Sequence, residues 1–183
     1  KVERWAHVTV QPLCEDQKDS QIFLLSKVIA RILQQRGNLI LEGGAFLVDD
    51  KAYLLLGPPG VGKSSVQAGL SLQGFPIVSD HYSAIIEKNG TWFISPSQQK
   101  LKLWEDAIEK VGITSNGLVQ IRESLNKFYM DTPIPNKERC EISGVIVLSI
   151  VPGLKSDFEI KRLRHFEALK ELNVEALTAF PED

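Results

Sequence analysis

Cysteine is scarce in this chain of 183 residues, which has only Cys14 and Cys140. The two lie far apart in the sequence and show none of the spacings that are typical of metal-binding cysteines. We therefore expect two reduced, partly buried thiols, as in a cytoplasmic protein, in preference to a disulfide or a metal site.

The chain also lacks a charge excess, a long apolar run and a signal-peptide pattern. Its formal net charge is −2, so no global field attracts nucleic acid or an anionic membrane. No apolar run approaches the length of a membrane span. The sequence begins at Lys1 and not at a methionine, which leaves room for residues upstream. We expect a cytoplasmic protein whose partners are neither nucleic acid nor membrane.

The composition that remains is that of an ordinary soluble globular chain, with 43% apolar and 24% charged residues. Its length predicts one domain, residues 1–183, with a sizeable core. We expect the core in residues 38–173, and a peripheral strand and helix in residues 1–37.

One motif dominates the sequence: residues 57–64, GPPGVGKS, match the phosphate-binding pattern G-x-x-x-x-G-K-[ST] without a mismatch. The apolar run at 52–56 before it is typical of a buried strand, and residues 64–70 after it can start a helix that Gly74 ends. Strand, loop and helix follow in the order that such a loop requires. A chance glycine turn is therefore the weaker interpretation.

The residue types in this loop suit a nucleotide's phosphates. Glycines leave several backbone N–H groups free to converge on an anion, and the start of the following helix points its N–H groups at the same place. Lys63 can reach the β- and γ-phosphates, and the Ser64 hydroxyl can occupy one place in a Mg²⁺ shell. The expected nucleotide-binding residues are Gly57, Pro58, Pro59, Gly60, Val61, Gly62, Lys63, Ser64 and Ser65.

Hydrophobic patterns predict the elements before the loop. Residues 2–10 alternate loosely, as in a strand, and Asp19-Ser20 cap an apolar stripe of helical spacing that Arg36-Gly37 end. Residues 38–48 indicate a strand interrupted at Gly43-Gly44, and residues 49–51 turn the chain back in a hairpin. Antiparallel pairing beside the loop's own strand is therefore expected.

After the loop, an apolar run at 75–80 ends in Asp80, and Asn89-Gly90 joins two strands at 82–86 and 91–95 as a hairpin. We expect a helix at 98–111, a loop at 114–117 and a short strand at 127–130, whereas residues 119–126 suit either a helix or a strand. Residues 144–151 predict a fully buried strand that Pro152-Gly153 end.

The C-terminal segment allows two arrangements. Ser156 and Glu159 suit the capping box of a helix, or residues 158–163 are extended and a helix starts near Arg164. In both arrangements the segment finishes in an amphipathic stretch that carries Phe166, Leu169 and Leu172.

Asp80 is the second informative position. It ends the strand that follows the loop's own helix, so in an α/β sheet it opens onto the same crevice as Lys63. A carboxylate there can accept the proton of an attacking hydroxyl or hold Mg²⁺. The alternative is an Asp that caps a turn.

Other charged residues are weaker candidates. His81 points either into the site or away from it, because successive side chains of a strand face opposite ways. Glu42 reaches the crevice only if its strand neighbours the loop. Candidates for a second phosphate clamp are Lys100, Arg122, Lys127, Lys137 and Arg139. Most of the five are expected to be solvated surface charges, and Arg122 and Lys127 are the favoured exceptions.

This combination resembles the C-terminal catalytic domain of HPr kinase/phosphorylase and its shorter relatives, which share a nucleotide site with ATP-dependent phosphoenolpyruvate carboxykinase. The resemblance covers roughly residues 38–173. It rests on Glu42-Gly43 before the loop, residues 52–64, the run Ile77-Val78-Ser79-Asp80 and an expected helix at Leu101-Lys102-Leu103-Trp104. A late strand at 145–150, followed by residues 163–172, resembles the shorter relatives.

The resemblance implies an α/β fold with a mixed sheet, often a homo-oligomer, and an ATP- and Mg²⁺-dependent kinase that acts on a serine hydroxyl of a protein or peptide. Lys63 and Ser64 would hold phosphates and metal, and Asp80 would be the general base and a metal ligand. Some shorter relatives belong with peptide-modifying enzymes, those for lasso peptides included, and phosphorylate a precursor peptide.

The sequence departs from the family at two positions. Glu42 stands where the family usually has His, and His81 where it has a second Asp; the signature peptide of the true HPr enzymes has no clear match. HPr as a substrate and the reverse reaction, phosphorolysis, are therefore not supported. The alternatives to a kinase are a nucleotide-binding regulatory module without transfer activity and a slow ATPase.

Overall fold

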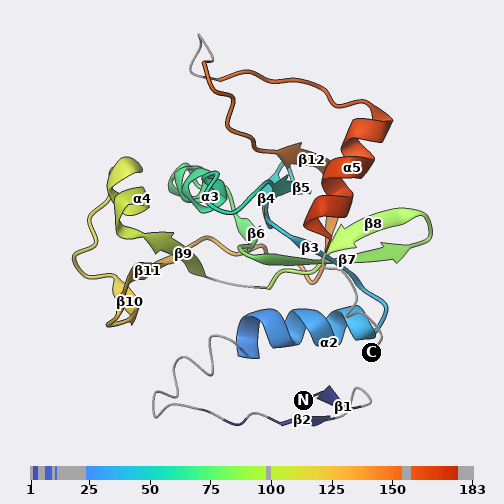
Figure 1. The fold of residues 1–183 in the computed structure, drawn as a ribbon, viewed down its shortest axis with the longest axis horizontal. Coiled ribbons are helices and arrows are strands. Elements are labelled where there is room, and N and C mark those ends of the chain that lie inside the picture. The colour runs from blue at the N-terminus through green and yellow to red at the C-terminus, as the bar shows by residue number, and fades with distance from the viewer. Residues whose placement is uncertain are drawn as a thin grey trace.

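A seven-stranded mixed sheet forms the centre of the protein, whose computed structural model describes residues 2–3, 7–9, 11, 24–97, 100–153 and 158–176 (Figure 1). In spatial order its strands are β3 (Leu39–Glu42), β7 (Tyr82–Lys88), β8 (Thr91–Ile94), β12 (Cys140–Val147), β5 (Lys51–Leu56), β4 (Gly44–Val48) and β6 (Ile77–Ser79). Only β12 and β5 pair in parallel, and the remaining neighbours are antiparallel. The expected antiparallel pairing beside the loop strand is confirmed.

This sheet curls. Only Gly43 separates β3 from β4, yet β3 forms one edge of the sheet and β4 lies next to the other edge strand. The chain can connect them so directly only if the sheet bends around and brings its two ends together. The break expected at Gly43-Gly44 is therefore the place where the chain passes from one end of the curled sheet to the other.

A second, three-stranded sheet lies beside the first. Its order is β10 (Val119–Arg122), β11 (Leu125–Asp131) and β9 (Lys100–Trp104), all antiparallel, and α4 (Glu105–Lys110) follows β9 directly. Apolar side chains of β4, β5, α3 (Lys63–Leu72), β9, α4 and β11 form one buried cluster. This small sheet is thereby held against the loop's helix.

The core follows the two-residue period of β5. Ala52, Leu54 and Leu56 point into the cluster enclosed by the curled sheet, while Leu55 points to the cluster under α3. All four are almost completely buried. Both faces of β5 are covered, and this explains why the sequence of the strand is a continuous apolar run.

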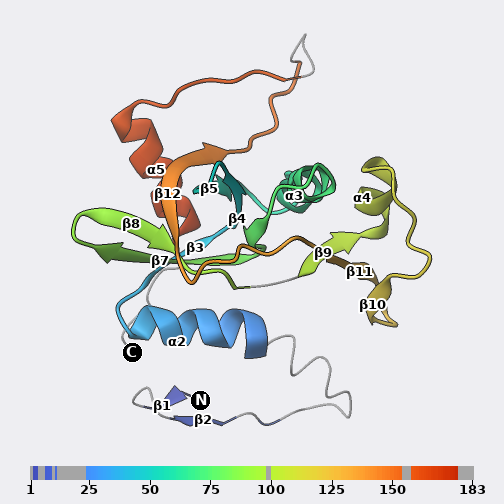
Figure 2. The same cartoon turned by 180° about the vertical axis from the view of Figure 1, so that it is seen from behind.

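Two helices flank the edge strand β3 and its neighbour. Figure 2 shows α2 (Ile29–Gln35) on one side of β3 and β7, and α5 (His165–Glu175) on the other. A wider helical turn, η1 (Leu24–Val28), precedes α2, and Gly37 ends the helix at φ +84°. The expected cap at Asp19-Ser20 lies outside the described residues. No helix of the described residues is long and apolar enough to cross a membrane.

Both predicted hairpins are confirmed. Asp49 and Asp50 take positive φ angles of 46° and 65° between β4 and β5, and Asn89 and Gly90 take 54° and 78° between β7 and β8. Such pairs of left-handed residues give the turn whose twist matches two antiparallel strands. Residues 114–117 lie outside helices and strands, as expected, and residues 119–126 contribute to strands β10 and β11.

The helix expected at 98–111 is wrong in its first half. Residues 100–104 form β9, and only Glu105–Lys110 is helical. Leu101 and Leu103 are buried on one side of the strand, whereas Trp104 is exposed, a period of two residues and not of 3.6. The Leu101-to-Trp104 part of the family resemblance therefore lies on a strand.

The strand expected at 144–151 differs in both its bounds and its burial. It runs from Cys140 to Val147, and Val145 and Ile146 remain about two-fifths exposed. Residues 2–10 also differ from expectation, because they contain two short paired strands, β1 (Val2–Glu3) and β2 (His7–Val8).

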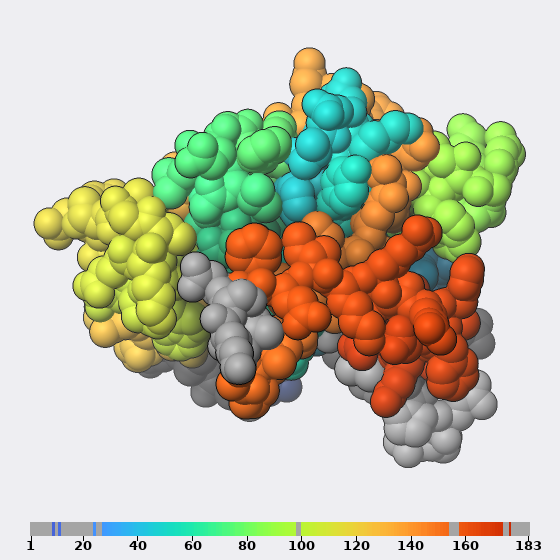
Figure 3. Space-filling view, turned by 90° about the horizontal axis from the view of Figure 1, so that it is seen from above, coloured from blue at the N-terminus to red at the C-terminus, as the bar shows by residue number. Residues whose placement is uncertain are grey.

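At the C-terminus the extended alternative holds. Residues 158–164 have no regular structure, and α5 begins after Arg164, whose backbone N–H bonds to the Glu167 carboxylate at 2.9 Å. Leu172 packs against the core, but Phe166 and Leu169 are 82% and 64% exposed. Figure 3 shows this segment across the same side of the molecule as α3 and the β4–β5 hairpin.

Candidate functional site

The glycine loop joins the end of β5 to the start of α3, as the motif requires. Gly57, Gly60 and Gly62 all have positive φ, at 135°, 82° and 105°. A Cβ atom on Gly57 would lie 2.5 Å from the Leu148 carbonyl oxygen, so the chain after β12 leaves room only for glycine. Gly62 precedes α3, whose first N–H groups have no side-chain cap. These amides are positioned to bind an anion.

Lys63 is the first residue of α3, and its ammonium group folds back over the loop. It donates to the Gly57 carbonyl and, at 3.2 Å, to the Pro58 carbonyl. Both acceptors are backbone groups of the loop itself. The positive charge of Lys63 therefore lies at the mouth of the loop. A phosphate bound there would give the ammonium group anionic hydrogen-bond acceptors in place of the neutral carbonyls.

Asp80 directly follows β6 and faces the loop. Its Oδ1 atom accepts a hydrogen bond from the Ser64 hydroxyl at 3.3 Å, and its Oδ2 atom accepts one from the Lys102 backbone N–H at 3.2 Å. The residue is only 6% exposed. The two residues expected to share a metal site, Ser64 and Asp80, are therefore in contact.

The electrostatics of this carboxylate follow from its burial. Removal from water raises the pKa of Asp80 above its ordinary value, although the Lys102 N–H and the positive charges of His81, Lys102 and Lys127 act in the opposite direction. Burial also lowers the pKa of Lys102 and that of His81. The buried carboxylate of Asp80 thus favours binding of a proton or of a cation.

Glu42 and His81 meet at the same end of the sheet. Glu42 ends β3 and pairs with Tyr82 of β7, two residues after Asp80, although β3 is an edge strand that does not pair with the loop's strand β5. Its charge raises the pKa of His81, against the larger effect of burial, and raises the pKa of Tyr82. The rings of His81 and Tyr82 lie 4.4 Å apart between centroids.

Of the five expected clamp residues, the structure brings Lys127 toward Asp80. Lys127 lies on β11, with its Nζ atom 5.2 Å from the centroid of the Trp104 ring, and its charge acts on Asp80, His81 and Lys102. Lys100 lies further along β9 and pairs with Asp131 at 3.3 Å. Arg122 is on β10, which β11 separates from β9.

Lys137 and Arg139, two of the candidates expected to be surface charges, lie away from the loop. Lys137 pairs with Asp50 at 3.1 Å, in the hairpin turn at the start of β5. Arg139 directly precedes β12, which runs parallel to β5. Both therefore lie at the end of β5 that is opposite the phosphate loop.

Lys102 is the site residue that the sequence reasoning missed. Its backbone holds Asp80, and its half-buried side chain lies close enough to influence that carboxylate. The signal that could have found it is the alternation of Leu101 and Leu103 with charged or aromatic neighbours, which indicates a strand with Lys102 on its outer face.

A buried chain of polar side chains fixes these elements relative to one another. Gln67 of α3 donates to the Ser79 carbonyl at 2.7 Å, and the Ser79 and Ser83 hydroxyls are 2.7 Å apart. The Ser83 hydroxyl donates to the Gly43 carbonyl at 2.8 Å. The loop's helix, the strand that carries Asp80 and the segment after Glu42 are thereby tied together.

The metal-ligating atoms at this site suit Mg²⁺ better than a metal ion whose ligands all come from protein side chains. No group of three or more His, Cys, Asp or Glu side chains among the described residues can hold a metal ion. Ser64 and Asp80 supply two oxygen atoms at one place. Mg²⁺ prefers oxygen and usually keeps several waters or phosphate oxygens, so two protein ligands fit it.

Comparison with known proteins adds little. No protein-family model and no curated protein sequence matches the chain. Among solved structures, the HPr(Ser) kinase/phosphatase from Coxiella burnetii matches with a TM-score of 0.42 and 16% identity, over 64% of this chain and 70% of that chain. A likeness this partial carries no inference about activity.

Proposed function

We propose that this protein is an ATP- and Mg²⁺-dependent phosphotransferase that acts on a serine hydroxyl of a protein or peptide. The observation that supports it best is the contact between Ser64, at the start of the loop's helix, and the buried carboxylate of Asp80. The same pair suits the Mg²⁺ site that nucleotide-binding loops use in general. An acid at the mouth of the loop also supplies what transfer to a hydroxyl requires.

The loop residues would bind and orient the phosphates. The backbone N–H groups within residues 57–65, which include the start of α3, would donate hydrogen bonds to the phosphate oxygens. The Lys63 ammonium group would donate to phosphate oxygens in place of the Gly57 and Pro58 carbonyls. Ser64 and Asp80 would hold Mg²⁺, which when bound neutralises charge on the nucleotide.

Asp80 would accept the proton of the acceptor serine. As the serine oxygen forms its bond to the γ-phosphorus, the bond from that phosphorus to the β-phosphate oxygen breaks, the hydroxyl proton moves to Asp80, and ADP leaves. Burial raises the pKa of Asp80, which suits a group that takes up a proton, while Lys102 and Lys127 act in the opposite direction and favour the ionised form. Burial keeps Asp80 away from bulk water.

A second candidate is a nucleotide-binding regulatory module of the same architecture that lacks transfer activity, or a slow ATPase. The observation that favours it is His81, which stands where the resembled family carries a second acid. Partial desolvation lowers the pKa of His81, so this position carries an imidazole with a weakened positive charge in place of a carboxylate.

Transfer to an acceptor separates these functions. The protein is incubated with ATP, Mg²⁺ and serine-containing peptides, and phosphate is located by mass spectrometry. We expect Asp80→Asn to lower transfer by about 10²- to 10⁴-fold while nucleotide affinity changes only several-fold, because a general base acts mainly in the transition state. Lys63→Ala should weaken both.

The matched control is Asp106→Asn, which changes an exposed acid of α4 that pairs with Lys110. This variant should transfer phosphate as the unchanged protein does. Near-normal transfer by Asp80→Asn contradicts the proposed base. Nucleotide binding with no phosphate on any acceptor, the protein's own serines included, supports the regulatory module.

Self-association is a separate proposal. Several large apolar residues of β12 and the segment after it are exposed, which is typical of a surface that contacts another protein. The most exposed are Ile150, Phe158, Ile160, Phe166 and Leu169. Light scattering across a range of concentrations tests whether two or more copies associate.

A further inference from the structure

The three-stranded sheet has an outer face that the phosphate chemistry does not use. In the register of β9 and β11, Leu101 pairs with Met130 and Leu103 with Phe128, and these four pack in the core. The alternate positions therefore face outward. They are Lys100, Lys102 and Trp104 on β9, Lys127, Tyr129 and Asp131 on β11, and Val119, which pairs with Tyr129, on β10.

This outer face is cationic and aromatic. It carries three lysines against one carboxylate, Asp131, whose side chain is 83% exposed. Trp104 is 49% exposed and Val119 is 64% exposed, although both are large apolar side chains. The chain as a whole has a net charge of −2, so this is a local concentration of positive charge.

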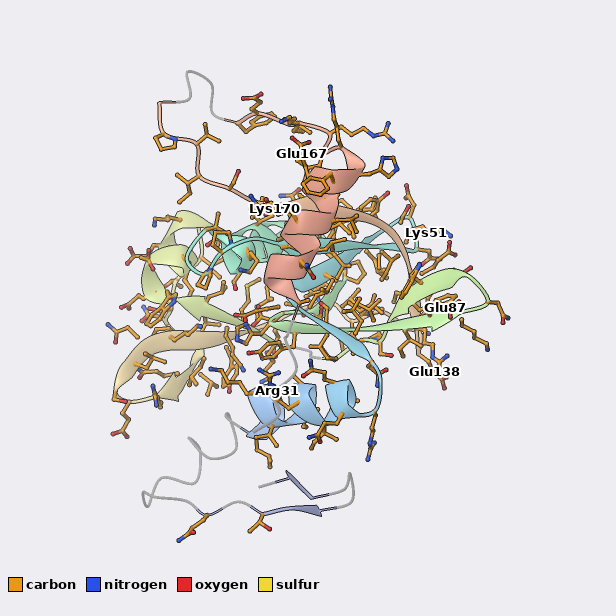
Figure 4. All side chains as sticks on the ribbon, turned by 45° about the vertical axis from the view of Figure 1, so that its right-hand side comes forward. Arg31, Lys51, Glu87, Glu138, Glu167 and Lys170 are labelled. Carbon is orange, nitrogen blue, oxygen red and sulfur yellow. The ribbon has the colours of Figure 1, made fainter. Side chains whose placement is uncertain are left out.

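The opposite end of the molecule carries charges of both signs, because Lys88 follows Glu87 in the β7–β8 hairpin and Lys137 and Arg139 flank Glu138 in the sequence. Figure 4 labels Glu87 and Glu138 close together beside the β7–β8 hairpin, on the side of the molecule away from the small sheet. Figure 1 shows the same separation, with β9, β10 and β11 at one end and the hairpin at the other. The attraction for a negatively charged partner therefore comes from the excess of lysine on the outer face itself.

The outer face is continuous with Asp80. The Lys102 N–H points away from β11, because it donates to the Asp80 carboxylate at the open edge of β9. The Lys102 side chain projects from the outer face at the same position. Lys127 lies over Trp104 on that face, and its charge also reaches Asp80. A peptide bound along this face would therefore pass next to the Asp80 carboxylate.

We propose that the outer face of β9 and β11 docks an acidic segment of the phosphate acceptor and places the acceptor serine beside Asp80. This inference rests on the proposed transfer function and adds the class of substrate, a polypeptide with carboxylates near the serine. From Lys100 to Trp104 the strand covers about 13 Å, the length of about four residues of an extended peptide.

The chemistry of the face defines the segment further. Lys127 and Trp104 pair across the two strands at one end of the face, and Lys100 lies at the other end, where it pairs with Asp131. One carboxylate of an extended chain can pair with Lys127 and a second can compete with Asp131 for Lys100, while the exposed part of Trp104 offers an apolar surface beside Lys127. Aromatic side chains give much of the energy in protein interfaces, and surrounding charges mainly add specificity. An apolar residue next to an acidic one, with a further acidic residue about four positions away, is therefore the expected pattern.

Direct binding tests the surface without any transfer. The probe is a fluorescein-labelled peptide with one serine and one leucine flanked by glutamates, and its counterpart carries lysines in place of the glutamates. We expect the acidic peptide to bind and the basic one not to. Lys100→Glu should weaken binding about fivefold, and Lys100→Glu with Trp104→Ala tenfold or more, both less at high salt.

Lys88→Glu is the matched control, because Lys88 is an exposed lysine at the end of β7, in the hairpin. It should leave peptide binding unchanged. Equal binding of the acidic and basic peptides, or equal effects of Lys88→Glu and Lys100→Glu, overturns the proposal. So does displacement of the peptide from this face by an oligothymidylate at lower concentration, which assigns the surface to nucleic acid.

Transfer kinetics keep this inference distinct from the proposed function. Lys100→Glu should raise the KM for the acidic peptide, and Asp80→Asn should bind that peptide normally yet fail to phosphorylate it. If the protein binds the acidic peptide but phosphorylates no acceptor, the transfer function fails and the docking surface stands. If it phosphorylates acidic and basic peptides alike, the docking surface fails and the transfer function stands.

Discussion

At the scale of single residues, Asp80 should destabilise the ligand-free protein because its carboxylate is buried. Burial raises the pKa of Asp80 in the folded state above the value 3.8 of the exposed group. The fold thus favours the protonated form, and the stability that this form contributes is lost as pH rises through the two pKa values. We expect Asp80→Asn to raise the melting temperature at pH 8.

The expected increase is a few degrees, since about 1 kcal/mol corresponds to about 2–4 °C in a protein of this size. Asparagine resembles the protonated carboxyl group and can keep the contacts with Ser64 and Lys102. The difference between the variant and the unchanged protein should shrink as the pH is lowered toward 4. A variant that melts lower at pH 8, with the same gap at pH 4, contradicts this account.

Part of the site is predictable residue by residue, because its signal is local. The glycine loop, Lys63 and Ser64 form one contiguous motif, and Asp80 follows the next strand. The basic residues carry no such local signal. Lys102, which holds Asp80, was not among the candidates, while Lys137 and Arg139 were candidates and lie at the far end of β5.

At the scale of elements, β9 shows why a helix and a strand are confused. Leu101, Trp104 and Ile108 recur at spacings that suit one side of a helix. The chain instead pairs residues 100–104 with β11 and buries Leu101 and Leu103, a cross-strand contact that the local sequence does not contain. Tertiary pairing thus outweighed the local pattern, and only Glu105–Lys110 remained helical.

The buried chain from Gln67 to Gly43 yields a prediction about how the elements hold together. Ser83→Ala should lower the free energy of unfolding by about 1–3 kcal/mol, because it leaves the Gly43 carbonyl and the Ser79 hydroxyl without this partner in a dry interior. Urea unfolding of the purified variant measures the change.

The double variant tests whether the two hydroxyls act as a pair. Ser79→Ala and Ser83→Ala remove the same hydrogen bond, so their combined cost should be smaller than the sum of the single costs. Ser115→Ala, which removes a 3.3 Å hydrogen bond to Glu105 outside the core, is the control and should cost little. Strict additivity at positions 79 and 83 would mean that the hydroxyls are independent.

At the scale of the whole molecule, the candidate site depends on the curl of the large sheet and on the position of the small one. Glu42, Ser64, Asp80, Lys102 and Lys127 come from five separate parts of the chain, spread over 85 residues by their numbers. The hairpins were predictable because a few residues determine each turn. The pairing of β12 with β5 across about half of the sequence has no comparable local cause.

Ligand binding should therefore stabilise the whole protein, because a single nucleotide would contact elements that the curled sheet and the small sheet bring together. With ATP and Mg²⁺ at about 100 times the dissociation constant, linkage predicts about 2.7 kcal/mol of added stability and a melting temperature higher by several degrees. EDTA should remove most of this increase, since Ser64 and Asp80 offer oxygen ligands to the metal.

Two variants make this last prediction specific to the loop. Ser64→Ala removes a hydroxyl at the start of α3 and should reduce the stabilisation by ATP with Mg²⁺ while the ligand-free melting temperature changes little, because its hydrogen bond to Asp80 is long at 3.3 Å. Thr91→Ala removes a hydroxyl from β8 at the distant hairpin and should leave the stabilisation intact. Equal shifts in both variants, or a shift that survives EDTA unchanged, would place the nucleotide elsewhere, because only a ligand held at the loop makes stability depend on Ser64 and on the metal together.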